Sequence, residues 1–422
     1  MQRLRLIVRL ALRNVRRQAR RSALTAAAMV VGLALLVMSR SLADGAHDEW
    51  IEAGVRLGSG HLAFQAPEFR ARHAIEEHLS AADRAAVEAA LADTVIAPHL
   101  KAVAPRLEIT ALASAAAAAV PVTVVGVDPA REPAFSEMDQ RIVEGRYLEP
   151  HDHLQGFVGV ELAQRLRLRL GDRLVLTAAG PDGAITDQLV RVVGTFRTAI
   201  PEVDQSLIHI PLATAQAWLG VDSGVTTIAV LLDASWNADR FTRRLQEALA
   251  PHADRIAVLS WRAASPELDA AVRMDDYGDY VFHGILFIII ALAIVNTVLM
   301  SVLYRTREFG VVRALGLRKR DTALLVLTEG LILTGISGLV GVLLGLAVTW
   351  GFFHDGFDLT AFMGDQMTAA GAVIDPVFIP QFRVVQLIQS AVSVAIVGLV
   401  ASLYPAWRAT RIDMAEAMKF EA

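Results

Sequence analysis

The chain contains four apolar stretches that are long enough to cross a membrane. Each is a run of 18 to 24 residues without Asp, Glu, Lys or Arg. A membrane-spanning helix needs about 20 mostly apolar residues. The pattern therefore predicts transmembrane helices at residues 22–42, 280–304, 324–351 and 384–407.

The first apolar stretch follows a basic segment, so it also fits a signal peptide with Ser41 and Ala43 as a weak cleavage pattern. We favour a retained helix because the apolar core is long for a signal peptide. Residues 1–21 also place apolar residues at helical spacing and Arg on the other face, which predicts an amphipathic helix on a membrane surface. A basic flank that only sets orientation is the alternative.

Lys and Arg are distributed unevenly around the spans. Residues 1–21 hold eight Arg and residues 305–320 hold five Arg and one Lys, whereas the segment between the last two spans holds four Asp and one Arg. Cytoplasmic segments carry the excess of positive charge, so we expect both termini in the cytoplasm. This assigns 305–323 and the tail 408–422 to the cytoplasm, and 43–279 and 352–383 to the outside.

The long outer segment alternates strand and helix patterns. Runs of β-branched residues bounded by turn residues predict strands at 122–127, 157–160, 173–177, 189–196, 207–210 and 226–232. Helical spacing of apolar residues predicts helices at 81–91, 161–168, 213–219 and 238–249. The mixture indicates an α+β domain, with two subdomains as an option, flanked by helical stalks near 41–60 and 261–280. The Ala-rich run 114–120 has no clear element pattern.

Composition agrees with a membrane protein that has a large water-exposed part. Hydrophobic residues make up 54% of the 422 residues, charged residues make up 20%, and the mean hydropathy is +0.44. Soluble proteins carry about 25% charged residues, so the values argue against a soluble enzyme, a coiled coil and a disordered chain. The expected fold class is an α-helical membrane protein with four transmembrane helices and an extracytoplasmic α+β domain between helices 1 and 2.

The sequence contains no recognisable catalytic or cofactor-binding motif. The sequence has no P-loop, no G-x-S-x-G, no H-E-x-x-H and no Cys, so we expect no catalytic residue, no metal and no cofactor in this chain. His151 and His153 fit a solvated loop better than a metal site, and the acidic cluster at 275–279 fits a membrane border better than a Ca²⁺ site. Glu329 begins the third span, where pairing with the basic loop is favoured over an ion path.

The third span carries closely spaced glycines. Small residues at three-to-four spacing let another helix approach closely. We therefore expect helix packing at Gly335, Gly338, Gly341 and Gly345. A seam between two copies and packing within one chain both remain open.

The loop between the second and third spans is the most informative stretch. It mixes apolar and basic residues in a short amphipathic pattern that suits a cytoplasmic partner. Residues 307–316 (Arg-Glu-Phe-Gly-Val-Val-Arg-Ala-Leu-Gly) closely resemble the R-E-x-G-x-x-R-A-L-G signature of FtsX-like ABC permeases. This family includes the MacB-type exporters and the lipoprotein-releasing LolC/LolE-type permeases.

Other segments agree with this resemblance. Residues 10–17 are similar to the family's A-x-R-N-x-x-R start, and residues 404–417 to its P-A-x-x-A-x-x-x-x-P-x-E-A-L ending, with Met414 in place of the usual Pro and Met418 in place of the usual Leu. The family's outer-domain blocks resemble residues 125–129, 144–148, 170–172 and 193–198, while residues 58–62 and Asp204 lean toward the LolC/LolE branch.

The resemblance implies a permease subunit of the bacterial inner membrane. It would pair with a second permease, identical or different, and with a cytoplasmic ABC ATPase dimer that binds ATP and Mg²⁺. ATPase closure would be relayed through the spans to the outer domain, a mechanism called mechanotransmission. The implied ATPase-coupling residues are Arg307, Glu308, Phe309, Gly310, Arg313, Ala314, Leu315 and Gly316, with Gly316 as a left-handed helix cap.

The resemblance leaves several functions open. The favoured hypothesis is extraction of lipoprotein or another amphiphile from the inner membrane. MacB-like export of drugs, peptides or toxins, and a signalling lever that activates a cell-wall hydrolase, are the alternatives; an unrelated membrane-bound enzyme is disfavoured by the empty motif search. The sequence does not identify the substrate, the ATPase, a periplasmic or outer-membrane partner, or whether the chain transports or only transmits force.

Overall fold

The chain divides into a helical unit and a sheet unit. The computed structural model describes residues 9, 11, 13, 19–58, 60–72, 74–116, 118–198, 200–314, 316, 318–358, 360, 367–369, 372–374 and 377–411. The predicted helix 1–21 and tail 408–422 thus lie largely outside the described residues. The helical unit comprises Met1–Ala46, Met274–Asp358 and Val377–Ala422, and the sheet unit comprises His47–Arg273 and Leu359–Pro376.

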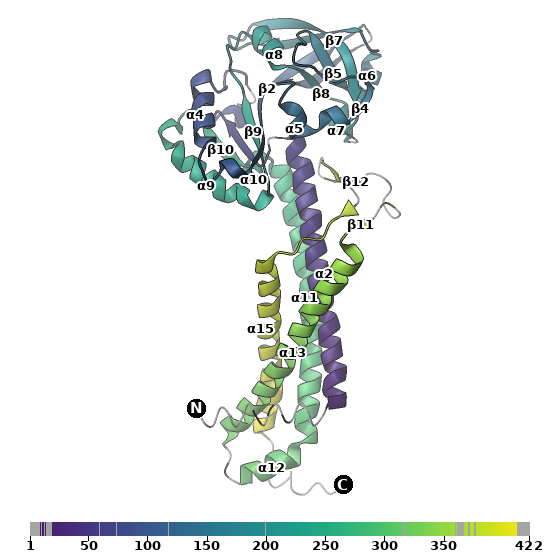
Figure 1. The fold of residues 1–422 in the computed structure, drawn as a ribbon, viewed down its shortest axis with the longest axis vertical. Helices are drawn as coiled ribbons and strands as arrows, with labels where there is room; N and C mark the ends of the chain where they lie inside the picture. The colour runs from purple at the N-terminus through teal and green to yellow at the C-terminus, as the bar shows by residue number, and fades with distance from the viewer. Residues whose placement is uncertain are drawn as a thin grey trace. The chain divides into compact units, whose positions relative to one another are not determined.

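Four helices of the described chain are long and apolar enough to cross a membrane. They are α2 (Ala19–Leu57), α11 (Pro266–Tyr304), α13 (Lys319–Phe353) and α15 (Val384–Thr410) (Figure 1). Each contains one of the apolar stretches identified from the sequence, so the prediction of four apolar helices is confirmed.

Helices α2 and α11 extend far beyond their apolar stretches. Each has 39 residues, or about 58 Å at 1.5 Å per residue, whereas the hydrocarbon core of a bilayer is about 30 Å thick. The residues expected to form stalks are helical up to Leu57, form the short helix Trp261–Ala264, and are helical again from Pro266. Proline suits the first helical position because its missing N–H would have no partner there.

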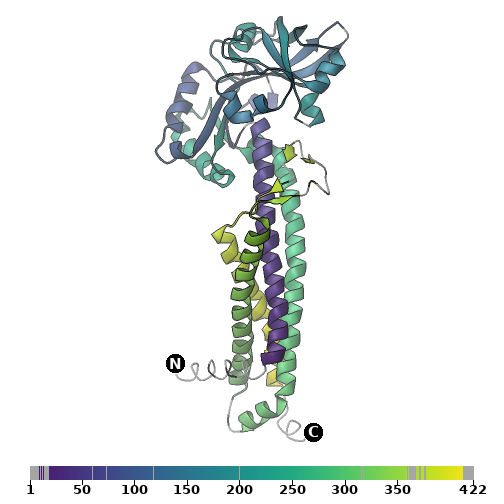
Figure 2. The ribbon, with the colours of Figure 1, turned by 45° about the vertical axis from the view of Figure 1, so that its right-hand side comes forward.

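The helices of the helical unit pack through two apolar clusters. α13 and α15 lie against each other, and Figures 1 and 2 both show the helices of this unit side by side. One cluster includes Met29, Ile294, Val298 and Leu333, and a smaller one includes Leu33, Leu36 and Val394. Many other apolar side chains on these helices are exposed, as in helices that face lipid.

The sheet unit is built on one mixed sheet of ten strands. The order is β10-β1-β9-β2-β3-β8-β5-β7-β4, and β6 pairs with β2 and β7. The pairs β3–β8 and β5–β7 are parallel and the others are antiparallel. The strands are β1 (Leu62–Gln65), β2 (Leu100–Ser114), β3 (Ala119–Val127), β4 (Ile142–Gly145), β5 (Gln155–Gly159), β6 (Arg173–Ala179), β7 (Ile185–Phe196), β8 (Leu207–Pro211), β9 (Thr227–Leu232) and β10 (Ala257–Ser260).

Short helices cover this sheet. They are α3 (Phe69–Arg72), α4 (Ala81–Leu91), α5 (Glu132–Ser136), α6 (Val160–Leu166), α7 (Pro201–Asp204), α8 (Leu212–Leu219), α9 (Ala238–Ala248) and α10 (Trp261–Ala264). Two small antiparallel sheets of two strands each lie between α13 and α15: β11 (Phe357–Asp358) pairs with β14 (Val377–Phe378), and β12 (Met367–Ala369) pairs with β13 (Ala372–Ile374). The mixture confirms an α+β fold for this segment.

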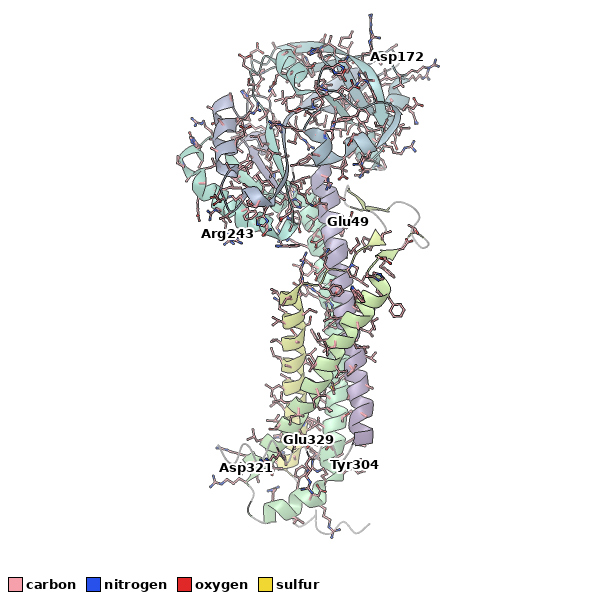
Figure 3. All side chains as sticks on the ribbon, in the orientation of Figure 1. Glu49, Asp172, Arg243, Tyr304, Asp321 and Glu329 are labelled. Atoms are coloured by element: carbon pink, nitrogen blue, oxygen red, sulfur yellow. The ribbon has the colours of Figure 1, made fainter. Side chains whose placement is uncertain are left out.

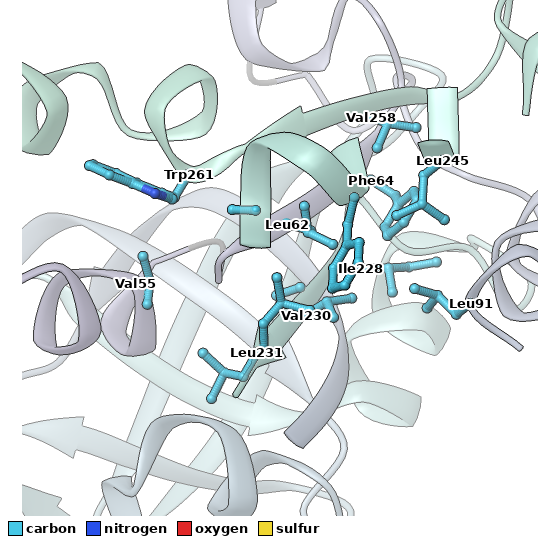
Figure 4. Packing of buried hydrophobic residues seen from close by; sticks show 14 of the residues in the cluster. Val55, Leu62, Phe64, Leu91, Ile228, Val230, Leu231, Leu245, Val258 and Trp261 are labelled. Carbon is cyan, nitrogen blue, oxygen red and sulfur yellow. The ribbon is translucent and has the colours of Figure 1, made fainter. Parts of the chain in front are cut away.

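The sheet unit holds two large apolar cores and a smaller cluster around Phe157 and Phe196, all within one compact unit, so the option of two subdomains stays a prediction. Figure 4 shows the first, where Phe64, Ile228 and Leu245 pack together with Val55 from the end of α2. The second includes Val124, Val158, Leu162 and Ile208. Strand β2 belongs to both cores, because Ala104 lies in the first and Leu107 in the second.

Strand β2 is the main element that the sequence patterns missed. Its first half contains Pro105, which argues against a strand paired on both sides. At Pro105 the strand pairs with β9, and its pairing with β3 begins only at Arg106. The proline therefore costs no hydrogen bond on the β3 side. The Ala-rich run is where β2 ends at Ser114 and β3 begins at Ala119.

Candidate functional site

A short helix joins the second and third apolar helices and carries the motif of residues 307–316. This helix, α12, spans Thr306–Ala314. The hydroxyl of Thr306 donates to the carbonyl of Leu303 at 2.6 Å, next to the turn between α11 and α12. Beyond the helix, Gly316 has φ +100°, a left-handed conformation in which a side chain is strained.

One arginine links α12 to its neighbours. Arg305 lies between α11 and α12 with its side chain only 10% exposed. Its Nε donates to Glu308 Oε2 at 2.8 Å and its Nη1 donates to Glu329 Oε2 at 3.0 Å. The hydroxyl of Ser301 donates to the other carboxylate oxygen of Glu329 at 3.2 Å. Glu329 is thus held by the basic loop, as favoured from the sequence; Figure 3 marks its place in the bundle.

Phe309 anchors α12 to the helical unit. Its ring is buried in the cluster that contains Val302, Leu325 and Val326, and the Arg305 guanidinium lies 5.0 Å from the ring centroid. Gly310 is buried as well. Of the proposed coupling residues, these two therefore face the protein interior.

The exposed face of α12 consists of other members of the motif. Arg307, Glu308 and Val311 are exposed and Arg313 is half-buried. The side chain of Ala314 and all of Leu315 lie outside the described residues. The helix thus has an inner side that holds it and an outer side of mixed charge and apolar character. Sequence reasoning missed Arg305, whose only signal was a basic residue two positions before the motif.

The glycines of α13 divide into two groups. A Cβ on Gly341 would lie 2.9 Å from Leu33 Cβ, and one on Gly345 would lie 2.9 Å from the carbonyl oxygen of Ala34, so both glycines pack against α2 of the same chain. Gly335 has no atom within 4 Å of such a Cβ, and Gly338 has only Leu33 at 3.9 Å. The Gly341–Gly345 pair thus serves intramolecular packing.

Two further close contacts were not expected. A Cβ on Gly330 would lie 2.2 Å from the hydroxyl oxygen of Ser402, and one on Gly398 would lie 2.6 Å from Thr334. Both contacts join α13 to α15. A pair of small residues on different helices cannot be recognised until the facing surfaces are known.

The sheet unit contains a buried ion pair next to the end of α2. The Arg106 guanidinium donates to both carboxylate oxygens of Glu132, with Nε at 3.2 Å from Oε2, and it also donates to the carbonyl of Gly58. Both side chains are almost fully buried. Burial lowers the pKa of Arg106, but the charge and hydrogen bonds of Glu132, together with the nearby Glu108 and Tyr147, outweigh burial and raise the pKa above its ordinary value.

A second buried polar group lies beside aromatic rings. The Nδ1 atom of His209 is 3.4 Å from the hydroxyl of Tyr147, and the rings of Phe157 and Phe196 lie close by. Burial lowers the pKa of His209 to about 4 and raises the pKa of Tyr147 well above its ordinary value. Both groups are therefore neutral near pH 7.

His151, weighed above as a metal ligand, and the adjacent Asp152 both have charged partners. Asp152 accepts two hydrogen bonds from Arg146 at 2.7 and 2.9 Å, and these bonds hold its pKa below the ordinary value. His151 lies 3.0 Å from Glu149 on the surface. Among the described residues, no group of three His, Cys, Asp or Glu side chains is arranged to hold a metal ion.

Two family models match successive parts of this chain. Residues 22–248 match the family model of the MacB-like periplasmic core domain, and residues 280–414 match that of the FtsX-like permease C-terminal region. The solved periplasmic region of MacB from Actinobacillus actinomycetemcomitans covers 50% of this chain and 93% of its own length at 13% identity, with a TM-score of 0.35.

Curated relatives agree with the family models. The lipoprotein-releasing system transmembrane protein LolC of Xylella fastidiosa is 26% identical over 71% of this chain and 73% of its own length. LolE of Haemophilus influenzae is 23% identical over 76% of this chain and 78% of its own length. The macrolide export ATP-binding/permease protein MacB of Bdellovibrio bacteriovorus is 31% identical over 31% of this chain and 17% of its own length. The chain therefore belongs to the ABC transporter permeases that combine a MacB-like periplasmic core domain with an FtsX-like C-terminal region.

Proposed function

We propose that this chain couples a cytoplasmic ABC ATPase to movement of its periplasmic domain. The observation that carries the proposal is the two-sided character of α12. Phe309, buried in the bundle, and Arg305, bonded to Glu308, hold the helix in place, while Arg307 and Val311 remain exposed on its outer side. A firmly anchored helix with an exposed mixed face suits a partner that must push on the membrane helices.

The proposed assembly contains two permeases and an ATPase dimer. ATP and Mg²⁺ bind in the ATPase, and this chain supplies neither a nucleotide site nor a catalytic residue. We place it in the bacterial inner membrane with both termini in the cytoplasm, because the Arg-rich segments flank the same ends of the spans. The chain connects its two units through α2 and α11, each of which is one continuous helix. These helices are the proposed route by which ATPase closure reaches the sheet unit.

The proposed substrate is a lipoprotein or another amphiphile extracted from the inner membrane. The alignment to LolC covers 71% of the chain, whereas that to MacB covers 31%. Export of a soluble compound is the second candidate, favoured by the match of residues 22–248 to the MacB-like core domain. A lipoprotein that copurifies from native membranes would support the first candidate, and an outer-membrane channel protein in its place would support the second.

The docking of the ATPase can be tested with exposed positions of α12. The complex is purified from native membranes in mild detergent, and its components are identified by mass spectrometry. We expect an ABC ATPase with the intact chain and its loss from the variant Arg307→Glu with Val311→Asp. Gly310 is a poor position for this test because it is buried, and a large side chain there would disturb the bundle.

Lys319→Glu is the matched control, because Lys319 is exposed and lies outside α12. It should retain the ATPase. Absence of any ATPase from the intact preparation would contradict the proposed function at its centre.

A further inference from the structure

Arg305 is placed where three helical segments meet. Its backbone lies between Tyr304, the last residue of α11, and Thr306, the first residue of α12. Its side chain is bonded to Glu308 on α12 and to Glu329 on α13, and Ser301 of α11 bonds to the same Glu329 carboxylate. A single guanidinium therefore connects α11, α12 and α13.

The geometry depends on an arginine. The guanidinium presents donors in a fixed planar fork, so Nε and Nη1 can bind two carboxylates at once. A lysine ammonium is a compact charge on a flexible stem and does not reproduce this fork. Burial strengthens the requirement, because a charged group that loses its partners away from water is costly. Arg305 and Glu329 are each about nine-tenths buried.

We propose that Arg305 and Glu329 are positioning residues that make α12 and the beginning of α13 move as one body. This proposal rests on the proposed function, since it needs an ATPase that displaces α12. The two residues face the bundle interior and do not contact the ATPase. They determine instead whether a displacement of α12 is passed to α13 or absorbed at the junction.

The packing around the pair supports this role. Phe309 ties α12 to Leu325 and Val326 of α13 in one apolar cluster, but such contacts are non-directional and permit sliding. The two carboxylates, each bound by Arg305 through one charge-assisted hydrogen bond, add direction, because a hydrogen bond weakens steeply away from its preferred angle. The apolar contact thus holds α12 near α13, and the ion pairs fix the angle between them.

The test uses the full complex in lipid nanodiscs and two variants, Glu329→Gln and Arg305→Lys. Hydrogen–deuterium exchange is measured in peptides covering α12 and the first turns of α13, with and without ATP. In the intact complex, ATP should change exchange in both segments together. In both variants, we expect the ATPase to stay bound and the response of α12 to remain, while the response of α13 is lost. A purely structural role would instead raise exchange without ATP as well.

Asp321→Asn is the matched control, a carboxylate earlier on the same helix whose removal should leave both responses intact. An ATP response of α13 that persists in both variants would overturn the proposal, and so would loss of the ATPase from them. Failure of the proposed function looks different, because the intact chain would then bind no ATPase at all.

Discussion

Gly345 of α13 lies against the backbone of α2 so closely that a Cβ placed on it would be 2.9 Å from the carbonyl oxygen of Ala34. The same Cβ would lie 2.9 Å from Val37 Cβ. This contact and the separate contact of Gly341 with Leu33 show that two of the predicted packing glycines are used within the chain. It also sets a limit on which residues can occupy this face of α13.

Replacement of Gly345 by Leu should destabilise the helical unit. Overpacking of a close contact costs about 1–3 kcal/mol, so the thermal unfolding midpoint of the full chain in detergent should fall. Gly335→Leu is the matched control on the same helix, because a Cβ on Gly335 would have no neighbour within 4 Å. Equal midpoints for the two variants would contradict the assigned α2–α13 contact.

The buried pair in the sheet unit should show a strongly non-additive response. Arg106→Met leaves Glu132 buried without its ion-pair partner, and loss of one partner of such a pair costs about 3–5 kcal/mol. Replacement of both residues, with Glu132→Leu added, should recover most of the stability. Thermal unfolding of the full chain in detergent measures both effects.

Arg244→Met provides the comparison for this pair. Arg244 binds Asp93 at 2.9 Å on the surface, where ion pairs contribute little to stability. The thermal unfolding midpoint of the Arg244→Met variant should therefore match that of the unchanged chain. If Arg106→Met behaves in the same way, the buried pair does not stabilise the domain.

The stability of the sheet unit should fall as the pH is lowered from about 6.5 to about 4. An unfolded histidine takes up its proton near 6.5, whereas burial lowers the pKa of folded His209 to about 4. Between these values the unfolded state binds more protons, so stability rises with pH in this window. The shift corresponds to roughly 3 kcal/mol at 1.36 kcal/mol per unit.

His209→Asn tests this pH dependence, because the amide can replace the bond near Tyr147 and does not titrate. Its unfolding midpoint should change less between pH 7 and pH 5 than that of the unchanged chain. His151→Asn is the control at an exposed position and should retain the full pH dependence. An unchanged slope in His209→Asn would assign the effect to other groups.

Gly316→Ala should weaken attachment of the ATPase without unfolding the bundle. Its φ of +100° strains any residue with a side chain, at a cost of about 1–2 kcal/mol. The strained position lies two residues after Ala314, the last residue of α12. Titration of detergent-solubilised permease with the purified ATPase measures the Kd. Gly351→Ala on α13, where nothing lies within 4 Å of a Cβ, should leave the Kd unchanged; equal Kd values for both variants would contradict the role of the turn.

The sequence by itself determined the features that depend on local composition and spacing. Charge-free runs of about 20 residues identify membrane helices because each span must satisfy its backbone within itself. Residues 81–91 and 238–249 were recognised as helices from apolar spacing, and the structure places α4 and α9 there. The motif at 307–316 likewise marked the position of α12.

Only the tertiary structure decided which of these residues meet. Arg305 and Glu329 are 24 residues apart and Arg106 and Glu132 are 26 apart, and no local pattern pairs them. Gly335 and Gly345 look equivalent in a row of small residues, yet only Gly345 faces α2. A side chain's role depends on the surface it meets, and that surface exists only after the helices and strands have packed.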